Sequence, residues 1–283
     1  GGSKVVALED TDVSKVGIPK VRLNPAVGIV EIANGCMSEC TFCQTKLAKG
    51  DLKSYRIGDI TRQIKQELVD GCKEVWLSST DNGCYGLDIG EDLSSLIDQV
   101  VQIPEDFKIR IGMMNPMFMP RIRDNLLKSF ENGKVFRFLH VPVQSGSNEV
   151  LNNMKRGHTV ETFKDVVRRF RAKFGPFTIS TDVIIGYPTE TQENFEETVN
   201  LLKETTPDIV NISRYSRRPG TLAAEMPQID ITEITRRSKQ ATELINTFPL
   251  ENNKKWIGWN GSVLFDGNLD GLVQGRNFEY KTQ

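Results

Sequence analysis

Short apolar runs alternate with longer amphipathic stretches along most of the chain. The runs are rich in Val, Ile or Phe and are bounded by turn residues, which is typical of β-strands. They predict six strands, over Val27–Ala33, Glu74–Ser79, Lys108–Gly112, Phe136–Val141, Thr178–Ile185 and Asp208–Arg214.

The stretches between the runs place apolar residues at helical spacing. They predict five helices, over Ile57–Asp70, Leu93–Val101, Arg121–Glu131, Val160–Lys173 and Asn194–Glu204. In the last of these helices Phe195, Val199 and Leu202 fall on one face, and Thr191 precedes it as a capping residue.

The order of these elements favours an α/β fold with a parallel sheet. Strands that alternate with helices pair in parallel through right-handed crossovers. The pattern fits an open doubly wound sheet or a partial (β/α) barrel, and by itself it leaves both open. In either fold, ligands bind at the carboxyl ends of the strands.

The composition indicates the size of the folded domain and the cellular compartment of the protein. The 283 residues are 38% hydrophobic and 26% charged, which is ordinary for one large soluble domain with an appendage. The net charge of -1 neither indicates nor excludes a nucleic-acid partner. Because no apolar run approaches the roughly 20 residues that span a bilayer, we expect a cytoplasmic protein with no membrane partner.

Both ends of the chain suggest a fragment of a longer protein. Residues 1–3 resemble the remnant of a cleaved tag. After Trp256 two strand-like runs, Ser262–Phe265 and Gly271–Val273, are too short to bury a core. We therefore expect three parts: a leader over residues 1–24, a core over 25–250 and an incomplete small domain over 251–283.

Three of the five cysteines, Cys36, Cys40 and Cys43, lie in one loop after the first strand. Thiolates bind zinc and iron–sulfur clusters. A structural zinc site, like an electron-transfer cluster, needs four ligands, and neither Cys72 nor a histidine forms a second pair with this loop. Three cysteines at this spacing favour an iron–sulfur cluster in which one iron has no protein ligand. They favour it over a zinc site and over purely structural cysteines.

Polar and turn residues follow the other strands in the same way. They lie at Ser79–Asp81, Asn115–Pro116, Gln144–Ser145 and Gly186–Glu190. We expect them beside the cysteine loop, although each can also serve only as a turn or a cap. We interpret His140, inside an apolar strand, as a satisfied core residue, and Cys72 and Cys84 as buried packing thiols.

The cysteine loop resembles the CxxxCxxC motif of the radical-SAM superfamily, with the aromatic Phe42 before the last cysteine. Over roughly residues 27–227 the chain is similar to the methylthiotransferases. The similarity lies in "GCMSECTFCQTKLAKGDLKSY", "LSSTDNGCYG", "LHVPVQSGSNEVLNNMKRGHT", "ISTDVIIGYPTETQENFEET" and "YSRRPGTLAAEMP".

The segment "SSTDNGCYGLDIG" is most similar to the archaeal and eukaryotic branch, which modifies N6-threonylcarbamoyladenosine at position 37 of tRNA. The last residues, from Trp256, resemble the opening half of the RNA-binding TRAM domain. The resemblance implies a partial (β/α)6 radical-SAM barrel followed by the start of a TRAM β-barrel. It implies a transferase that makes the 2-methylthio derivative of that nucleoside.

The resemblance also implies the cofactors and partners. Cys36, Cys40 and Cys43 would hold a [4Fe–4S] cluster whose open iron chelates S-adenosylmethionine. The partners would be a tRNA anticodon stem-loop and an electron donor of the flavodoxin or ferredoxin type. Arg217 and Arg218, after the sixth strand, would contact anticodon-loop phosphates, whereas the other basic runs are typical of solvated faces.

The same resemblance assigns residues to S-adenosylmethionine. Phe42 would lie against its adenine, and Ile184 and Gly186 would let the backbone approach that ring. The polar contacts to its methionine and ribose would come from Ser79, Asp81, Gln144, Arg156 and Ser180, with Asp182 orienting them or facing the substrate. Arg156 is read as the carboxylate contact, since a guanidinium suits bidentate recognition, or as a solvated helix residue.

The chain departs from the family in one respect. Complete methylthiotransferases carry an N-terminal domain with three more cysteines, for a second [4Fe–4S] cluster that handles sulfur. Cys72 and Cys84 are on separate elements and cannot replace that trio. We therefore expect a second cluster only in the full-length protein, and here one cluster with S-adenosylmethionine cleavage.

Two alternatives remain. Within the same chemistry, the substrate is isopentenyl-adenosine tRNA or a ribosomal-protein aspartate. In a different class, the chain is a non-catalytic RNA-binding module stabilised by zinc.

Overall fold

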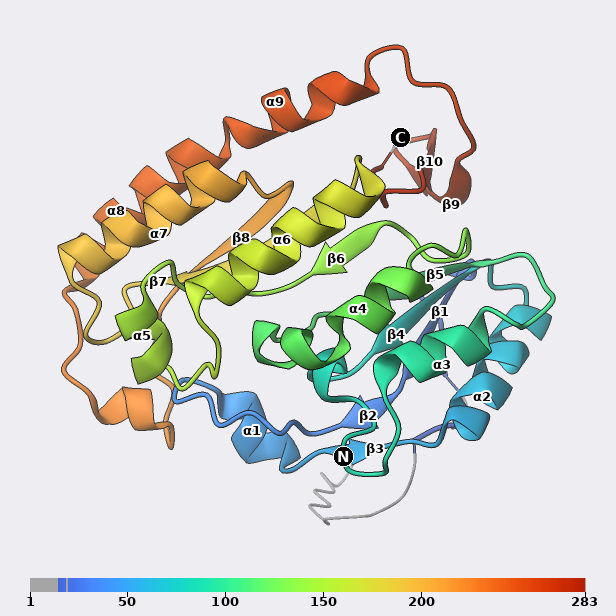
Figure 1. Cartoon of the computed structure of the whole chain (residues 1–283), viewed down its shortest axis with the longest axis horizontal. Helices are drawn as coiled ribbons and strands as arrows, with labels where there is room; N and C mark the ends of the chain where they lie inside the picture. The colour runs from blue at the N-terminus through green and yellow to red at the C-terminus, as the bar shows by residue number, and fades with distance from the viewer. Residues whose placement is uncertain (1–14, 19, 283) are drawn as a thin grey trace, which may run out of the picture.

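The computed structural model describes residues 15–18 and 20–282, so the predicted tag remnant lies outside the described residues (Figure 1). Six parallel strands form its centre, in two sheets of three. One contains β1 (Val27–Glu31), β4 (Glu74–Ser78) and β5 (Lys108–Ile111). The other contains β6 (Phe138–His140), β7 (Thr178–Ile185) and β8 (Ile209–Arg214).

The two sheets meet between β5 and β6. Ile109 forms a parallel bridge with Val135, and the Met114 backbone N–H donates to the His140 carbonyl at 2.9 Å. The spatial order of the six strands therefore follows their order in the chain. A doubly wound sheet would reverse direction at a switch point, so the structure decides for the partial barrel.

A layer of helices covers the outside of this curved sheet (Figure 1). Successive helices contact one another, because each crossover returns the chain beside the previous one. The layer contains α2 (Ile57–Val69), α3 (Leu93–Val100), α4 (Met119–Ser129), α6 (Val160–Phe174), α7 (Gln192–Thr205) and α8 (Ile231–Ile245).

The helices form where the apolar spacing predicts them. On α6, Val160, Phe163, Val167 and Phe170 are buried on one face, and full burial of each such side chain contributes roughly 1.5–3 kcal/mol. The predicted cap of α7 is confirmed. The Thr191 hydroxyl accepts from the Asn194 N–H, while the Asn194 side chain accepts from the Thr191 N–H.

Several elements differ from the predicted ones. The first predicted strand splits, because the chain turns after Glu31 and Ala33–Asn34 (β2) pairs with Lys53–Ser54 (β3) across the cysteine loop. The helix α8 was not predicted, and only Ile234, Arg237 and Ala241 of its residues are buried. The short helices α1 (Gln44–Lys49), α5 (Asn148–Asn153) and α9 (Phe248–Asn253) were also not predicted. None of the helices in the described part of the chain has the length and apolar character needed to cross a membrane.

The C-terminal hairpin of β9 (Leu264–Leu269) and β10 (Leu272–Arg276) lies at the amino ends of the barrel strands (Figure 1). The residues after it enter the barrel. The Tyr280 ring packs against Trp76, Phe136 and Phe138, and the Arg110 guanidinium lies 5.3 Å from the centre of the Tyr280 ring. This segment closes the amino end of the barrel interior and leaves the carboxyl end for a site.

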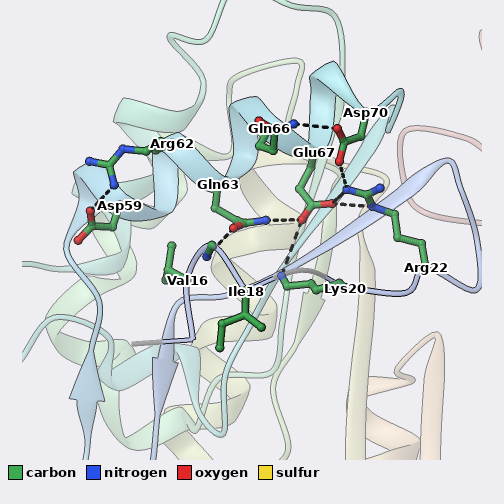
Figure 2. A pocket seen from close by; sticks show the side chains of 11 residues that line it. Val16, Ile18, Lys20, Arg22, Asp59, Arg62, Gln63, Gln66, Glu67 and Asp70 are labelled. Carbon is green, nitrogen blue, oxygen red and sulfur yellow. Dashed lines mark hydrogen bonds and ion pairs between the residues drawn. The ribbon is translucent and has the colours of Figure 1, made fainter. Parts of the chain in front are cut away.

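Part of the leader is tied to α2 through one buried carboxylate, shown in Figure 2. Glu67 accepts from Arg22 Nε at 2.8 Å and from Gln63 Nε2 at 2.6 Å, and its side chain is 1% exposed. Lys20 Nζ lies 3.7 Å away. These contacts line a pocket on the outer side of α2, which contains none of the residues predicted to form the site.

Candidate active site

The cysteine loop runs from β2 to α1 at the carboxyl ends of the strands, and backbone contacts hold both of its sides. The Cys36 N–H donates to the Gly50 carbonyl at 3.3 Å, and the Thr41 N–H donates to the Met154 carbonyl at 3.1 Å. Gly35 is required before the first cysteine: its φ is 70°, and a Cβ there would lie 1.9 Å from the Asp51 carbonyl oxygen.

The thiols of Cys36 and Cys40 face different partners. Cys36 is 7% exposed, and its Sγ accepts from the Ser38 N–H at 3.3 Å. The contact with the Cys84 thiol, followed by the hydrogen bonds from Ser38, lowers the pKa of Cys36 to about 5. Burial raises the pKa of Cys40, against the opposing effect of the Arg156 guanidinium. The lowered pKa of Cys36 favours its thiolate, which is the form that binds metal.

Arg156 is buried, so the alternative interpretation of it as a solvated helix residue is wrong. It is 5% exposed, and its guanidinium donates to Cys40 Sγ at 3.3 Å and to the Pro142 carbonyl at 3.0 Å. Its Nε is buried without a hydrogen-bond partner. An unpaired buried donor beside a thiol is costly in the absence of an anion, so the environment of Arg156 fits a carboxylate ligand.

Asp81 lies beneath the cysteine loop and is 2% exposed. One carboxylate oxygen accepts from the Gly83 N–H at 2.9 Å and from the Asn115 N–H at 3.0 Å. The other, Oδ2, lies 3.9 Å from Cys36 Sγ. Burial raises the pKa of Asp81 to about 6, so the carboxylate sits where a cation would stabilise it.

Ser79, the neighbouring predicted contact, is half-buried. Its hydroxyl donates to Asn82 Oδ1 at 2.6 Å, within the turn that follows β4. This bond is the turn role that the sequence leaves open for such residues. Its role as a cofactor contact stays a prediction.

Phe42 and Ile184, both predicted to lie near adenine, pack against one small apolar cluster although they are far apart in the sequence. The cluster consists of Val150, Met154, Tyr187, Tyr215 and Ala223. Together with this cluster, Phe42 and Ile184 form an apolar surface of the kind against which a flat aromatic base packs.

Three predicted residues share the inner face of β7, because alternate residues of a strand point the same way. They are Ser180, Asp182 and Ile184. Asp182 accepts from Asn211 Nδ2 at 2.7 Å and lies 3.0 Å from His140 Nε2. The pKa of Asp182 is lowered, because the His140 and Asn211 hydrogen bonds outweigh the opposing effect of burial.

His140 is therefore not enclosed in the apolar core. It is satisfied, as expected, but its ring faces the barrel interior on β6, where it is 19% exposed. Asn211 was missed entirely. The available signal was that Asn211 is a polar residue between Val210 and Ile212 on the last strand. In the sheet it lies opposite Asp182.

Gln144 and Gly186 both have positive φ, 76° and 78°. Gln144 continues the pairing with β7: its N–H donates to the Asp182 carbonyl and its carbonyl accepts from Ile184, each at 2.9 Å. At Gly186 a Cβ would lie 2.4 Å from Ile234 Cγ1 of α8. Helix packing therefore explains this glycine, and the predicted approach to adenine is not needed to account for it.

The other two cysteines are buried, as predicted. Cys72 follows α2 and its Sγ donates to the Pro25 carbonyl at 3.5 Å. Cys84 is 0% exposed and its Sγ donates to the Asp81 carbonyl at 3.2 Å. Its position within 4.8 Å of Cys36 Sγ was not visible in the sequence, where 48 positions separate the pair.

Sequence comparison relates the whole arrangement to known proteins. The sequence profile of the radical SAM superfamily matches residues 30–202. A probable threonylcarbamoyladenosine tRNA methylthiotransferase of Pyrococcus horikoshii is 40% identical over 99% of this chain, which spans 67% of that relative. The threonylcarbamoyladenosine tRNA methylthiotransferase of Drosophila melanogaster is 41% identical over 82% of this chain, which spans 42% of that relative.

Solved structures show the same fold at low sequence identity. Coproporphyrinogen III oxidase of Escherichia coli, a radical SAM enzyme, superimposes with a TM-score of 0.57 at 16% identity, over 78% of this chain and 52% of that one. The methyltransferase TsrM of Kitasatospora setae, with tryptophan and an S-adenosylmethionine analogue bound, superimposes with a TM-score of 0.57 at 16% identity. The match covers 75% of this chain and 41% of that one.

The donor set fits the cofactors of these enzymes. Three thiols on one loop suit three irons of a [4Fe–4S] cluster. Beside them, the buried Asp81 and the partly unpaired Arg156 offer opposite charges of the kind that an amino acid's ammonium and carboxylate require. The chain belongs to the radical SAM superfamily and, within it, to the family of the threonylcarbamoyladenosine tRNA methylthiotransferases.

Proposed function

We propose that this chain is the radical-SAM core of a tRNA methylthiotransferase, which converts N6-threonylcarbamoyladenosine to its 2-methylthio derivative. The observation that carries the proposal is the meeting of the cysteine loop, Asp81 and Arg156 at the carboxyl end of the barrel. The names of its relatives supply the substrate.

The residues of this chain bind and orient the cluster and S-adenosylmethionine. Cys36, Cys40 and Cys43 hold the cluster, and the guanidinium of Arg156 stabilises the thiolate of Cys40. Asp81 receives the ammonium group of S-adenosylmethionine, since its Oδ1 is already engaged by two backbone donors and its Oδ2 faces the cysteine loop. When bound, the cluster supplies the electron that cleaves the sulfonium.

The inner face of β7 continues the site toward the substrate. Asp182 is held by His140 and Asn211, and this geometry keeps its carboxylate charged and fixed inside the barrel. The Tyr280 segment closes the opposite end and excludes water from that side.

A cavity of about 700 Å³ opens along the inner face of β1 and β4, lined by Glu31, Ser78, Ser79 and Lys49 among others. It gives a nucleoside a route to the site from the open edge of the partial barrel. Arg217 and Arg218 belong to the chain segment that reaches the cysteine loop, where the Ala223 N–H donates to the Thr41 carbonyl at 2.9 Å. Their charges suit the phosphates of an anticodon stem-loop.

The finer assignments extend this proposal. We place one cluster on the described residues, because Cys72 and Cys84 lie on separate elements; a second cluster belongs to the full-length protein. A flavodoxin- or ferredoxin-type donor supplies the electron in the cytoplasm. We divide the chain into a leader up to residue 24, a radical-SAM core over residues 25–250 and the start of a TRAM domain, which contains the β9–β10 hairpin.

Anaerobic reconstitution with iron and sulfide tests the proposed function. The chain should take up about four irons and, with a reductant and S-adenosylmethionine, should release 5′-deoxyadenosine. Cys40→Ala should lose both, whereas Cys72→Ala should keep both, since its thiol lies outside the cysteine loop and donates to the Pro25 carbonyl. If the zinc-free chain takes up no iron and releases no 5′-deoxyadenosine, yet still binds stoichiometric zinc, the result would instead support the non-catalytic module.

A further inference from the structure

Cys84 lies in a second group of metal-binding atoms that overlaps the cysteine loop at a single residue. The ligand atoms of Cys36, Asp81 and Cys84 all lie within 4.8 Å of one another, and all three residues are buried. They come from two segments, the loop after β2 and the turn of η1 (Asn82–Cys84) after β4.

The spacing suits one ion rather than a cluster. Zinc binds sulfur at about 2.3 Å and carboxylate oxygen at about 2.1 Å, so neighbouring ligands of a tetrahedral ion lie about 3.6 Å apart. Cys36 Sγ and Asp81 Oδ2 are 3.9 Å apart. The thiolates of a cluster bind different irons and must stand farther from one another. Cys84 is therefore too close to Cys36 to bind a second iron of the same cluster.

The donor types select the metal. Two thiolates and one carboxylate suit zinc, with its fourth position left to water, whereas thiolates are poor ligands for magnesium or calcium. Asp81 is also preoriented. Its Oδ1 accepts from the Gly83 and Asn115 N–H groups, which leaves Oδ2 directed at Cys36. Hydrogen bonds of this kind to a ligating carboxylate orient it for the ion.

We propose that Cys36, Asp81 and Cys84 form a zinc site in the cluster-free chain, and that zinc and the cluster exclude each other because both require Cys36. Zinc binding here releases the Cys84 proton and replaces its hydrogen bond to the Asp81 carbonyl with a metal–sulfur bond. The site makes zinc a competitor of cluster assembly, and it leaves Cys40 and Cys43 without a metal.

Zinc titration of the cluster-free, reduced chain under argon tests the site, with a chromophoric chelator as competitor and with cobalt as a spectroscopic substitute. The parent chain should bind one zinc, and its cobalt form should show thiolate charge-transfer and tetrahedral d–d absorption. Cys84→Ala should weaken zinc binding more than about 100-fold, since even outer contacts of a metal site account for 10–100-fold.

Two matched variants separate this site from the other thiols. Cys40→Ala removes a thiol of the cysteine loop, and Cys72→Ala removes a buried thiol elsewhere. Both should bind zinc as the parent does. Loss of zinc in Cys40→Ala, or unchanged binding in Cys84→Ala, would place the ion on the cysteine loop and overturn the proposal.

Competition with cluster assembly gives an independent readout. One equivalent of zinc, added before iron and sulfide, should lower the iron content of the parent chain. The iron content of Cys84→Ala should be the same with and without zinc. Equal iron uptake by the zinc-treated and untreated parent would contradict mutual exclusion, and failure of Cys84→Ala to take up iron at all would show that Cys84 serves the cluster instead.

Discussion

The guanidinium of Arg156 donates to the Pro142 carbonyl and to Cys40 Sγ, although Arg156 and Cys40 are 116 positions apart in the sequence. Its neighbour His158 shows how strongly burial acts on single groups here. His158 Nδ1 lies 3.2 Å from the Arg156 carbonyl, and its Nε2 is buried without a partner. Burial, followed by the Arg156 charge, lowers the pKa of His158 to about 4.

His158 should make the fold sensitive to acid. Its pKa is about 6.5 in the unfolded chain and about 4 in the native one, so between these values only the unfolded state binds the proton. Stability should therefore fall as the pH falls below 6.5, by about 2 kcal/mol at pH 5. Urea unfolding of the parent and of His158→Gln at pH 7.5 and pH 5 measures this loss.

The variant serves as its own control, because all other titrating groups are common to both chains. His158→Gln should lose about 2 kcal/mol less than the parent between the two pH values. An equal loss in both chains would mean that His158 is protonated in the native state at pH 5.

At the scale of elements, the turn between β7 and α7 depends on contact with α8. The Gly186 N–H donates to Glu190 Oε2 at 2.9 Å, and Arg237 of α8 donates to the same oxygen at 2.9 Å. Arg237 is 5% exposed, so this member of a basic run is a buried structural residue and not part of a solvated face. The turn and the helix form one unit behind the site.

Gly186→Ala should destabilise the chain for two reasons. Its positive φ alone costs about 1–3 kcal/mol for a residue with a Cβ, and contact with Ile234 adds about 1–3 kcal/mol. Gly175→Ala is the matched control, because Gly175 has a φ of 66° and open space around a Cβ. Thermal or urea unfolding should show the larger loss for Gly186→Ala.

A double-mutant cycle isolates the contact. In an Ile234→Ala background, Gly186→Ala should cost at least about 1 kcal/mol less than in the parent, because the clash is removed. The cost of Gly175→Ala should not change. Identical costs of Gly186→Ala in both backgrounds would show that the backbone, and not α8, requires glycine.

At the scale of the whole molecule, the exposed arginines differ in the carboxylates that they meet. On α6, Arg168 and Arg169 both bind the Asp165 carboxylate, at 2.5 and 2.9 Å. Arg217 lies 3.7 Å from the Glu225 carboxylate, which is 77% exposed, whereas the Asp165 carboxylate is only 23% exposed. Such an exposed pair contributes little and exchanges readily with a phosphate.

Replacing Arg217 and Arg218 together with alanine should weaken tRNA binding and lower the slope of log Kd against log salt by about one to two. Filter binding or fluorescence anisotropy over a range of salt concentrations measures both effects. Arg168→Ala with Arg169→Ala is the control of equal charge and should leave the slope unchanged. If both double variants bind alike, Arg217 and Arg218 lie outside the tRNA footprint.

Sequence pattern predicted most of the barrel, because the strands and helices have strong and distinct periods and alternate without interruption. The β7 bounds agree with the prediction, and the α2 and α3 bounds agree to within one residue at the end. Elements with weak periods were missed. α5 has only two buried residues, Val150 and Leu151, and β2 is formed by pairing across a loop rather than by its own residues.

What the sequence by itself determined is the local chemistry: three thiols at short spacing on one loop, and polar residues after successive strands. These are set by neighbours in the chain, and parallel pairing brings strand ends together in any such fold. Only the tertiary structure decided which side chains meet across long separations. It buries Arg156 against Cys40, places Cys84 beside Cys36 and brings Tyr280 into the barrel, because close packing depends on distances that no linear pattern contains.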